Sequence, residues 1–324
     1  MEWFGAGLNA PLIAVRAIHF AATAMTAGTL VFRMVVLEPA LRSEQTPGSG
    51  LAANNLRTQT LRVAWIGLTL TVVSGVIWLL FQAASMSELP LGEAMTSSLL
   101  VTVLQETQFG RVSEIRVVLA LILAMCLAYH RFAPANWLSL GAGLGLAAAI
   151  AWTGHAGSTP GELGDLHVAA DALHLLAGAA WIGGLVPLTV LLTAARRDRE
   201  LALASLARNA TRRFSTLGVI SVAVLAVTGI VNAWILVGSF QALVSTGYGR
   251  LLMLKLVVLT IMLIFAAINR YWLTPRLIFS SGKELPVQAL RQLTHNSAIE
   301  IALGFAIFAI VGMLGTMHPA IHLF

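Results

Sequence analysis

The chain has 324 residues, of which 58% are hydrophobic and only 10% are charged, whereas about 25% of residues are charged in ordinary soluble domains. This composition excludes a soluble domain and predicts an all-α integral membrane protein. The net charge of +6 does not indicate a nucleic-acid partner, because the basic residues lie at the ends of apolar segments and not on one exposed face.

Eight apolar segments are each long enough to cross about 30 Å of hydrocarbon as a helix. In chain order they cover residues 11–37, 61–84, 112–130, 137–153, 166–193, 214–238, 250–271 and 297–317. The N-terminus lacks the basic region of a cleavable signal, so the first segment is expected to be retained. The single cysteine, Cys126, excludes disulfides and any cysteine-based zinc or iron–sulfur site.

The basic residues predict the orientation of these segments. Fourteen of the 20 lie in or beside the connections after the first, third, fifth and seventh segments. The other connections and both tails contain no basic residue and carry acidic residues instead. Because basic loops remain in the cytoplasm, both termini are expected on the opposite, outer side of the membrane.

Residues in the first four segments match residues in the last four. The matched groups are His19 with His174, Ser74-Gly75 with Thr228-Gly229, and Arg111 and Arg116 with Arg250 and Lys255. They predict two parallel four-helix repeats related by an axis along the membrane normal, with chance similarity among apolar helices as the alternative. The one membrane domain then has three parts: helices one to three in residues 1–135, helix four with a periplasmic His loop in 136–165, and the second repeat in 166–324.

The fifth segment carries the densest set of polar residues. His167, Asp171 and His174 are spaced i, i+4 and i+7, which places them on one helix face that Trp181 continues. An ionisable residue inside a membrane span costs about 2.5 to 3.5 kcal/mol on insertion scales, so a functional site is the first hypothesis for this face. Packed and hydrogen-bonded histidines between helices are the structural alternative.

Histidine and methionine gather in the outer half of the predicted bundle. The candidate metal ligands there are His155, His174, His318, His19, His167, Met317, Met313 and His322. Met313 and Met317 are spaced i and i+4, so a helix lets both thioethers share a face. Thioether and imidazole ligands together favour Cu(I) over a hard cation, although methionine is also an ordinary core residue.

Several charged residues also lie within the segments. Arg16 and Asp171 each precede a helical histidine by three residues, and they are predicted to form an ion pair across the repeat interface. Arg250 and Lys255 begin the seventh segment on the outer side. Such side chains extend toward the interface, or they hold an acidic group such as a propionate or a carboxylate.

Three stretches carry a family resemblance: Gly154-His155-Ala156-Gly157, Asp171 to Leu185, and Tyr248 to Lys255. They are similar to the copper resistance protein D (CopD) family of bacterial inner-membrane proteins. The resemblance implies a protein of eight transmembrane helices that passes copper from the periplasm to the cytoplasm. Some members carry or accompany a periplasmic copper-binding β-sandwich, and this sequence contains none, so a separate copper-binding donor protein is the implied partner.

A second resemblance is to the membrane protoporphyrinogen oxidase family, whose members bind haem. Residues 166–193 fit in part its pattern of a helical His followed by Trp and Gly-Gly. It implies haem b with His19 and His174 as axial ligands. No helix carries two His about fourteen residues apart, the pattern of two-haem bundles.

The sequence therefore predicts a copper-binding inner-membrane protein that moves copper without ATP through an outer His/Met site. It contains no nucleotide-binding G-x-x-x-x-G-K-[ST] loop and no nucleophile motif beside the histidines, so neither a pump nor a hydrolase is expected. The alternatives are a haem oxidoreductase, which alone would make the protein an enzyme, and a non-transporting copper chaperone or sensor.

Overall fold

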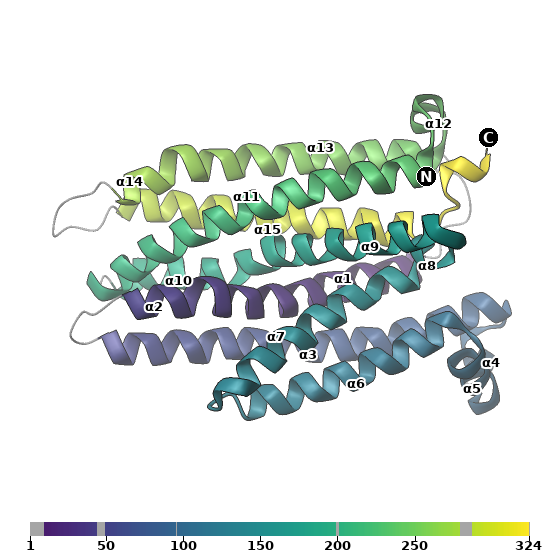
Figure 1. Cartoon of the computed structure of the whole chain (residues 1–324), viewed down its shortest axis with the longest axis horizontal. Coiled ribbons are helices and arrows are strands. Elements are labelled where there is room, and N and C mark those ends of the chain that lie inside the picture. The colour runs from purple at the N-terminus through teal and green to yellow at the C-terminus, as the bar shows by residue number, and fades with distance from the viewer. Residues whose placement is uncertain (1–9, 44–48, 95, 199–200, 279–286, 324) are drawn as a thin grey trace.

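The structure is a computed structural model that describes residues 10–43, 49–94, 96–198, 201–278 and 287–323. Within these residues every regular element is a helix, and no strand is present. The long helices run side by side along one axis and form a single bundle (Figure 1). The predicted all-α class is confirmed.

The first part of the chain contains, in order, α1 (Ala10–Val31), the π-helix η2 (Phe32–Leu37), α2 (Glu38–Ser43), α3 (Ser49–Ser87), α4 (Leu91–Ala94), α5 (Ser97–Glu106), α6 (Gln108–Ala128), α7 (Ala133–Ala148) and the 3-10 helix η3 (Ala149–Thr153). The second part contains α8 (His155–Ser158), α9 (Gly161–Gly178), the π-helix η4 (Ala179–Gly183), α10 (Gly184–Asp198), α11 (Leu201–Val237), α12 (Phe240–Ser245), α13 (Gly247–Ile268), the π-helix η5 (Asn269–Leu273), α14 (Thr274–Ile278), α15 (Val287–Leu314) and the 3-10 helix η6 (Ala320–Leu323).

Seven helical stretches are long and apolar enough to cross a membrane: Ala10–Ser43, Ala53–Ser87, Ala133–Thr153, Gly161–Arg197, Ala202–Val237, Gly247–Leu277 and Val287–Leu314. They correspond to seven of the eight predicted segments. The eighth, predicted at residues 112–130, coincides with α6, which has 21 residues. Three charged side chains near its start, Arg111, Glu114 and Arg116, keep α6 out of the apolar set.

Two of the helices begin in the same way. Thr107 before α6 and Thr246 before α13 each accept a hydrogen bond of 2.9 Å from the backbone N–H three residues later, at Gly110 and Gly249. A hydroxyl at this position satisfies a helix N–H group that has no partner within the helix. Each short preceding helix, α5 or α12, packs against the helix that follows it.

α1 occupies the centre of the bundle, where it packs against α3, α7, α15 and η4. At the crossing with η4, a Cβ added at Gly28 would lie 2.5 Å from the carbonyl carbon of Gly183 and 2.6 Å from the nitrogen of Gly184. A Cβ added at Gly183 would lie 2.6 Å from the carbonyl carbon of Ala24. Only glycine permits backbones to approach this closely. We call this crossing of Gly28 with Gly183 the central glycine contact.

The two ends of the bundle differ in their elements and their charge. The start of α1 and the end of α15 lie at the same end as α8 and α12, whereas α2, α14 and the end of α10 lie at the opposite end (Figure 1). The last turns of those three helices carry Arg42, Arg196, Arg197 and Arg276. We call the two ends the α8 end and the arginine end.

Candidate functional site

Two predicted ligands, His155 and His167, are joined by one hydroxyl group. The Thr159 hydroxyl lies 3.0 Å from the backbone carbonyl oxygen of His155 and 2.8 Å from Nδ1 of His167. It donates its single proton to the carbonyl, so we assign the ring proton of His167 to Nδ1, which donates to the hydroxyl oxygen. Nε2 of His167 is then unprotonated, which is the form of imidazole that binds a metal.

His155 also contacts the end of α15. Its Nε2 lies 3.3 Å from the backbone carbonyl oxygen of Leu314, and its ring centroid lies 6.2 Å from that of Tyr248. Met313 and Met317 are partly buried against the apolar cluster that includes Tyr248 and Leu314. His155 and the two methionines therefore border the same cluster at the end of α15.

The end of α15 differs from the sequence prediction. The eighth segment was expected to run to residue 317, but the helix ends at Leu314 and the chain turns, with the N–H of Met317 donating to the Leu314 carbonyl at 3.2 Å. Met313 and Met317 therefore do not share one helix face. His318 follows the turn and is exposed, and the side chain of His322 lies outside the described residues.

His19 uses both of its ring nitrogens within the first half of the chain. Nδ1 lies 2.9 Å from the Ser74 hydroxyl oxygen, and that hydroxyl donates to the Leu70 carbonyl at 2.5 Å. Nδ1 of His19 is therefore the donor, and Nε2 accepts a hydrogen bond from the Arg116 guanidinium. His19 is 2% exposed. A metal would have to displace Arg116 to reach this imidazole.

His174 has a matching contact but a different neighbour. Its Nδ1 lies 2.9 Å from the Thr228 hydroxyl, which donates to the Val224 carbonyl at 2.7 Å. Nδ1 of His174 thus carries the proton, and Nε2 keeps its lone pair. Lys255, the residue that matches Arg116 in sequence, interacts electrostatically with His174.

Arg16 and Asp171 have separate neighbours. The Arg16 guanidinium lies 5.2 Å from the ring centroid of Trp78, and it is 6% exposed. Asp171 accepts a hydrogen bond of 3.3 Å from Asn232 and interacts electrostatically with Lys255. Within the part of the chain that the structure describes, Arg16 and Asp171 do not form the predicted ion pair.

The other predicted residues lie away from the histidines of α8. Arg250, in the first turn of α13, is partly exposed. Trp181 is 2% exposed and lies in η4, where it lines a cavity of about 220 Å³ between α10, α11, α13 and α15. That cavity also contains Glu300 and Asn269, which the sequence reading did not select. The signal was available, because Glu300 is an ionisable residue inside an apolar segment.

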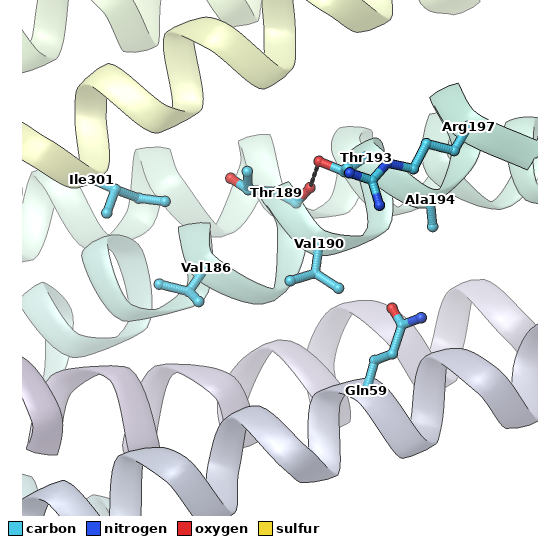
Figure 2. Close-up of a pocket in the computed structure, with 8 residues that line it drawn as sticks. All are labelled: Gln59, Val186, Thr189, Val190, Thr193, Ala194, Arg197 and Ile301. Carbon is cyan, nitrogen blue, oxygen red and sulfur yellow. Dashed lines mark hydrogen bonds between the residues drawn. The ribbon is translucent and has the colours of Figure 1, made fainter.

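A larger cavity, of about 520 Å³, lies between α3 and α10 near the arginine end. Figure 2 shows Gln59 of α3 facing Val190 of α10, and Arg197 extending along α10 beside Thr193. None of the predicted ligands lines this cavity. It is therefore separate from the histidines at the α8 end.

Among the residues that the structure describes, no group of three or more His, Cys, Asp and Glu side chains could hold a metal ion. At the α8 end, Thr159 instead links the backbone of His155 to the imidazole of His167, and Met313 and Met317 pack against the cluster that His155 also contacts. This arrangement suits a soft ion with few ligands better than a hard cation that needs many oxygen ligands.

Comparison with known families accounts for most of the chain. Residues 7–165 match the family model described as copper resistance protein D-like, N-terminal domain, and residues 208–314 match the model described as copper resistance protein D. The chain belongs to the copper resistance protein D family. The predicted family resemblance is thereby confirmed, and two of the three stretches that carry it, Gly154–Gly157 and Tyr248–Lys255, lie within the matched residues.

Curated relatives match 81% to 95% of the chain. The chain is 29% identical to copper resistance protein D of Pseudomonas syringae pv. tomato over 95% of this chain and 96% of that protein. It is 28% identical to the inner membrane protein YebZ of Escherichia coli K12 over 95% of this chain and 98% of that protein. It is also 28% identical to the copper transport protein CutJ of Bacillus subtilis 168, over 81% of this chain and 46% of that protein.

These matches associate the family with copper and with the inner membrane, and they do not support the haem alternative. That alternative used His19 and His174 as axial ligands of one haem. Both ring nitrogens of His19 are already hydrogen-bonded, to Ser74 and to Arg116. His19 therefore has no free nitrogen to give to an iron.

Proposed function

We propose that this protein binds Cu(I) at the α8 end and moves copper from the periplasm to the cytoplasm without ATP. The contact of His155 with the Leu314 carbonyl carries the proposal, because it places the α8 turn beside the end of α15, where Met313 and Met317 lie. Imidazole and thioether are ligands that Cu(I) prefers. The names of the Pseudomonas and Bacillus relatives support copper as the ligand.

The proposed entry site combines the Thr159-linked histidines with the turn after α15. Its ligands are His155, His167, Met313, Met317, His318 and, beyond the described side chains, His322. His174 is seven residues beyond His167 in α9, so it lies about 10 Å deeper along the helix. Its unprotonated Nε2 makes it the next ligand on an inward path. Successive weak sites along a path suit transport, because a tight site would not release the ion.

The proposed direction depends on an orientation in which the α8 end faces the periplasm. The arginine end carries the cluster of basic residues, and basic ends remain in the cytoplasm. Both termini are then periplasmic. α6 is the eighth span in this arrangement, since its 21 residues extend about 31 Å, and its charged start lies at the α8 end.

Matched contacts support two parallel repeats. Gly28 follows His19 by nine residues, and Gly183 follows His174 by nine residues, so the two glycines hold equivalent positions. They meet each other at the central glycine contact. A contact between equivalent positions is what a two-fold axis produces. We therefore place the repeat axis between α1 and η4, at the central glycine contact and parallel to the membrane normal.

The proposal is tested by copper analysis of the detergent-purified protein after anaerobic exposure to Cu(I) and desalting. We expect about one copper or more per chain, and a loss of that copper in His155→Ala and His167→Ala. His295→Ala is the matched control, because His295 is exposed in the first turns of α15 at the arginine end. Equal copper loss in the control, or iron in place of copper, would contradict the site.

Transport is tested with proteoliposomes that contain a Cu(I)-responsive dye. We expect dye signal with the wild type and a strongly reduced rate with His174→Ala, while copper binding to the purified variant persists. If the wild type binds copper but does not transport it, the protein is a copper chaperone or sensor and not a transporter. A separate periplasmic copper-binding protein is the proposed donor, and adding the copper-loaded donor should increase the rate.

A further inference from the structure

Glu300 is a carboxyl group in the middle of a membrane-spanning helix. It lies thirteen residues after the start of α15 at Val287, about 20 Å along a helix of 28 residues. Its side chain is 2% exposed. A carboxylate at this depth is costly unless a cation or several donors stabilise it.

The hydrogen bonds of Glu300 come from a neutral amide. Nδ2 of Asn269 donates to Oε1 of Glu300 at 2.6 Å, and Oδ1 of Asn269 accepts from Asn296 at 2.8 Å. Asn269 is the first residue of the π-helix η5, and its backbone carbonyl accepts from the Thr274 hydroxyl at 2.7 Å. π-helical turns inside α-helices are frequent at functional sites.

No charged side chain of the described residues interacts with this carboxyl. Arg270, on the same π-helix, donates instead to the backbone carbonyl of Ser215 at 3.0 Å and to its hydroxyl at 2.7 Å. On α1, which packs against α15, Arg16 stacks on Trp78. Arg33 of η2, the continuation of α1, has Glu38 and Arg57 as its charged neighbours. Among the residues that the structure describes, the carboxyl therefore has no counter-ion.

The carboxyl borders the cavity of about 220 Å³ that Trp181 also lines. Arg270 and Tyr271 are the other titratable residues that line it. The uncharged polar residues of its wall are Asn269, Ser215, Ser297, Thr211 and Thr274. Tyr271 is 69% exposed, so this wall reaches the outside of the bundle. The volume has room for a few water molecules, because one water occupies about 30 Å³ in the liquid.

We propose that Glu300 is a proton-binding site that exchanges its proton through this cavity with the side of the membrane at the arginine end. With no counter-ion, the neutral carboxylic acid is the resting form, and its O–H transfers a proton to cavity water to leave the carboxylate and a hydronium ion. The Asn269 amide holds the carbonyl oxygen in either form. The proposed orientation of the protein is needed only to identify the arginine end with the cytoplasm. The proton-binding site itself does not depend on copper.

Infrared spectroscopy of the purified, copper-free protein tests this site. At neutral pH we expect a carbonyl stretching band of a protonated carboxylic acid that shifts in D₂O and disappears in Glu300→Gln. Glu38→Gln is the matched control and should keep the band, because Glu38 forms an ion pair of 2.7 Å with Arg57 and is ionised. Asn269→Ala should keep the band at a higher frequency, since its carbonyl loses a donor, and this variant serves if Glu300→Gln does not fold.

Two results would overturn the site. The first is a band that is absent from the wild type or unaffected by both the Glu300 and Asn269 substitutions. The second is a band that disappears when choline is replaced by sodium at constant pH, which would identify a cation site instead. Neither measurement contains copper, so its failure is distinct from failure of the proposed copper site.

Discussion

At the scale of single residues, hydroxyl groups decide which histidine nitrogens are available. Thr159, Ser74 and Thr228 each give their proton to a backbone carbonyl and accept from a histidine Nδ1. The Nε2 atoms are then fixed as unprotonated acceptors. For His19 that acceptor is occupied by Arg116, so the same hydroxyl arrangement leads to different chemistry in the two halves.

Thr159→Val is expected to weaken Cu(I) binding by at least about tenfold, because loss of a group that orients a metal-binding histidine typically costs 10- to 100-fold in affinity. The affinity is measured by competition with a Cu(I) chelator under anaerobic conditions. Thr260→Val is the control, since its exposed hydroxyl only bonds the Leu256 carbonyl of its own helix. Unchanged affinity in Thr159→Val would show that the hydroxyl does not organise the site.

Sequence reasoning predicted most of these residues but not their contacts. The matching of His19-Ser74 with His174-Thr228 was visible because helical spacing and identity survive in an apolar background. The Arg116 contact with His19 was not predictable, because both an interfacial position and an inward one suit an arginine near a helix start. Asp171 contacts Asn232 and not Arg16. This contact depends on how α9 packs on α11, which the sequence does not reveal.

At the scale of elements, glycine determines how closely the helices approach. Gly28→Ala and Gly183→Ala are expected to destabilise the protein by about 1 to 3 kcal/mol, the usual cost of overpacking. Thermal unfolding of the detergent-solubilised protein measures this change. Gly141→Ala is the matched control in α7, where a Cβ would meet nothing within 4 Å.

The control should be neutral or slightly stabilising, because alanine is the better helix former by up to about 1 kcal/mol. If Gly141→Ala lowered the stability as much as Gly28→Ala, the close approach at the central glycine contact would not be the cause of the destabilisation. In the sequence, Gly183-Gly184 after Trp181 were interpreted only as part of a family motif. Their packing against α1 explains why these glycines are required there.

Helix boundaries were the weakest part of the sequence prediction. Hydropathy located the apolar centres, but α3 begins at Ser49 and α11 at Leu201, each about twelve residues before the predicted segment. The extra turns of α3 are mostly polar, and those of α11 combine leucine and alanine with Arg208, Arg212 and Arg213, so a search for apolar segments leaves both out. At the other end, α15 stops at Leu314, three residues before the predicted end.

At the scale of the whole molecule, the charge difference between the two ends predicts which side each end occupies. In a background of Cys126→Ala, Glu162→Cys should react with a membrane-impermeant maleimide added to intact spheroplasts, and Arg131→Cys should react only after permeabilisation. Both residues are exposed, so accessibility differs only by side. The reverse labelling pattern would invert the proposed transport direction.

The central glycine contact has a consequence for ancestry. If one four-helix unit was copied to make this chain, Gly28 and Gly183 descend from a single glycine that once touched its own counterpart. The ancestor was then a homodimer, held at its axis by two identical helices. Fusion of the two genes would then have allowed each half to change independently. The equivalent positions 116 and 255, which carry Arg116 and Lys255, would be one result of that divergence.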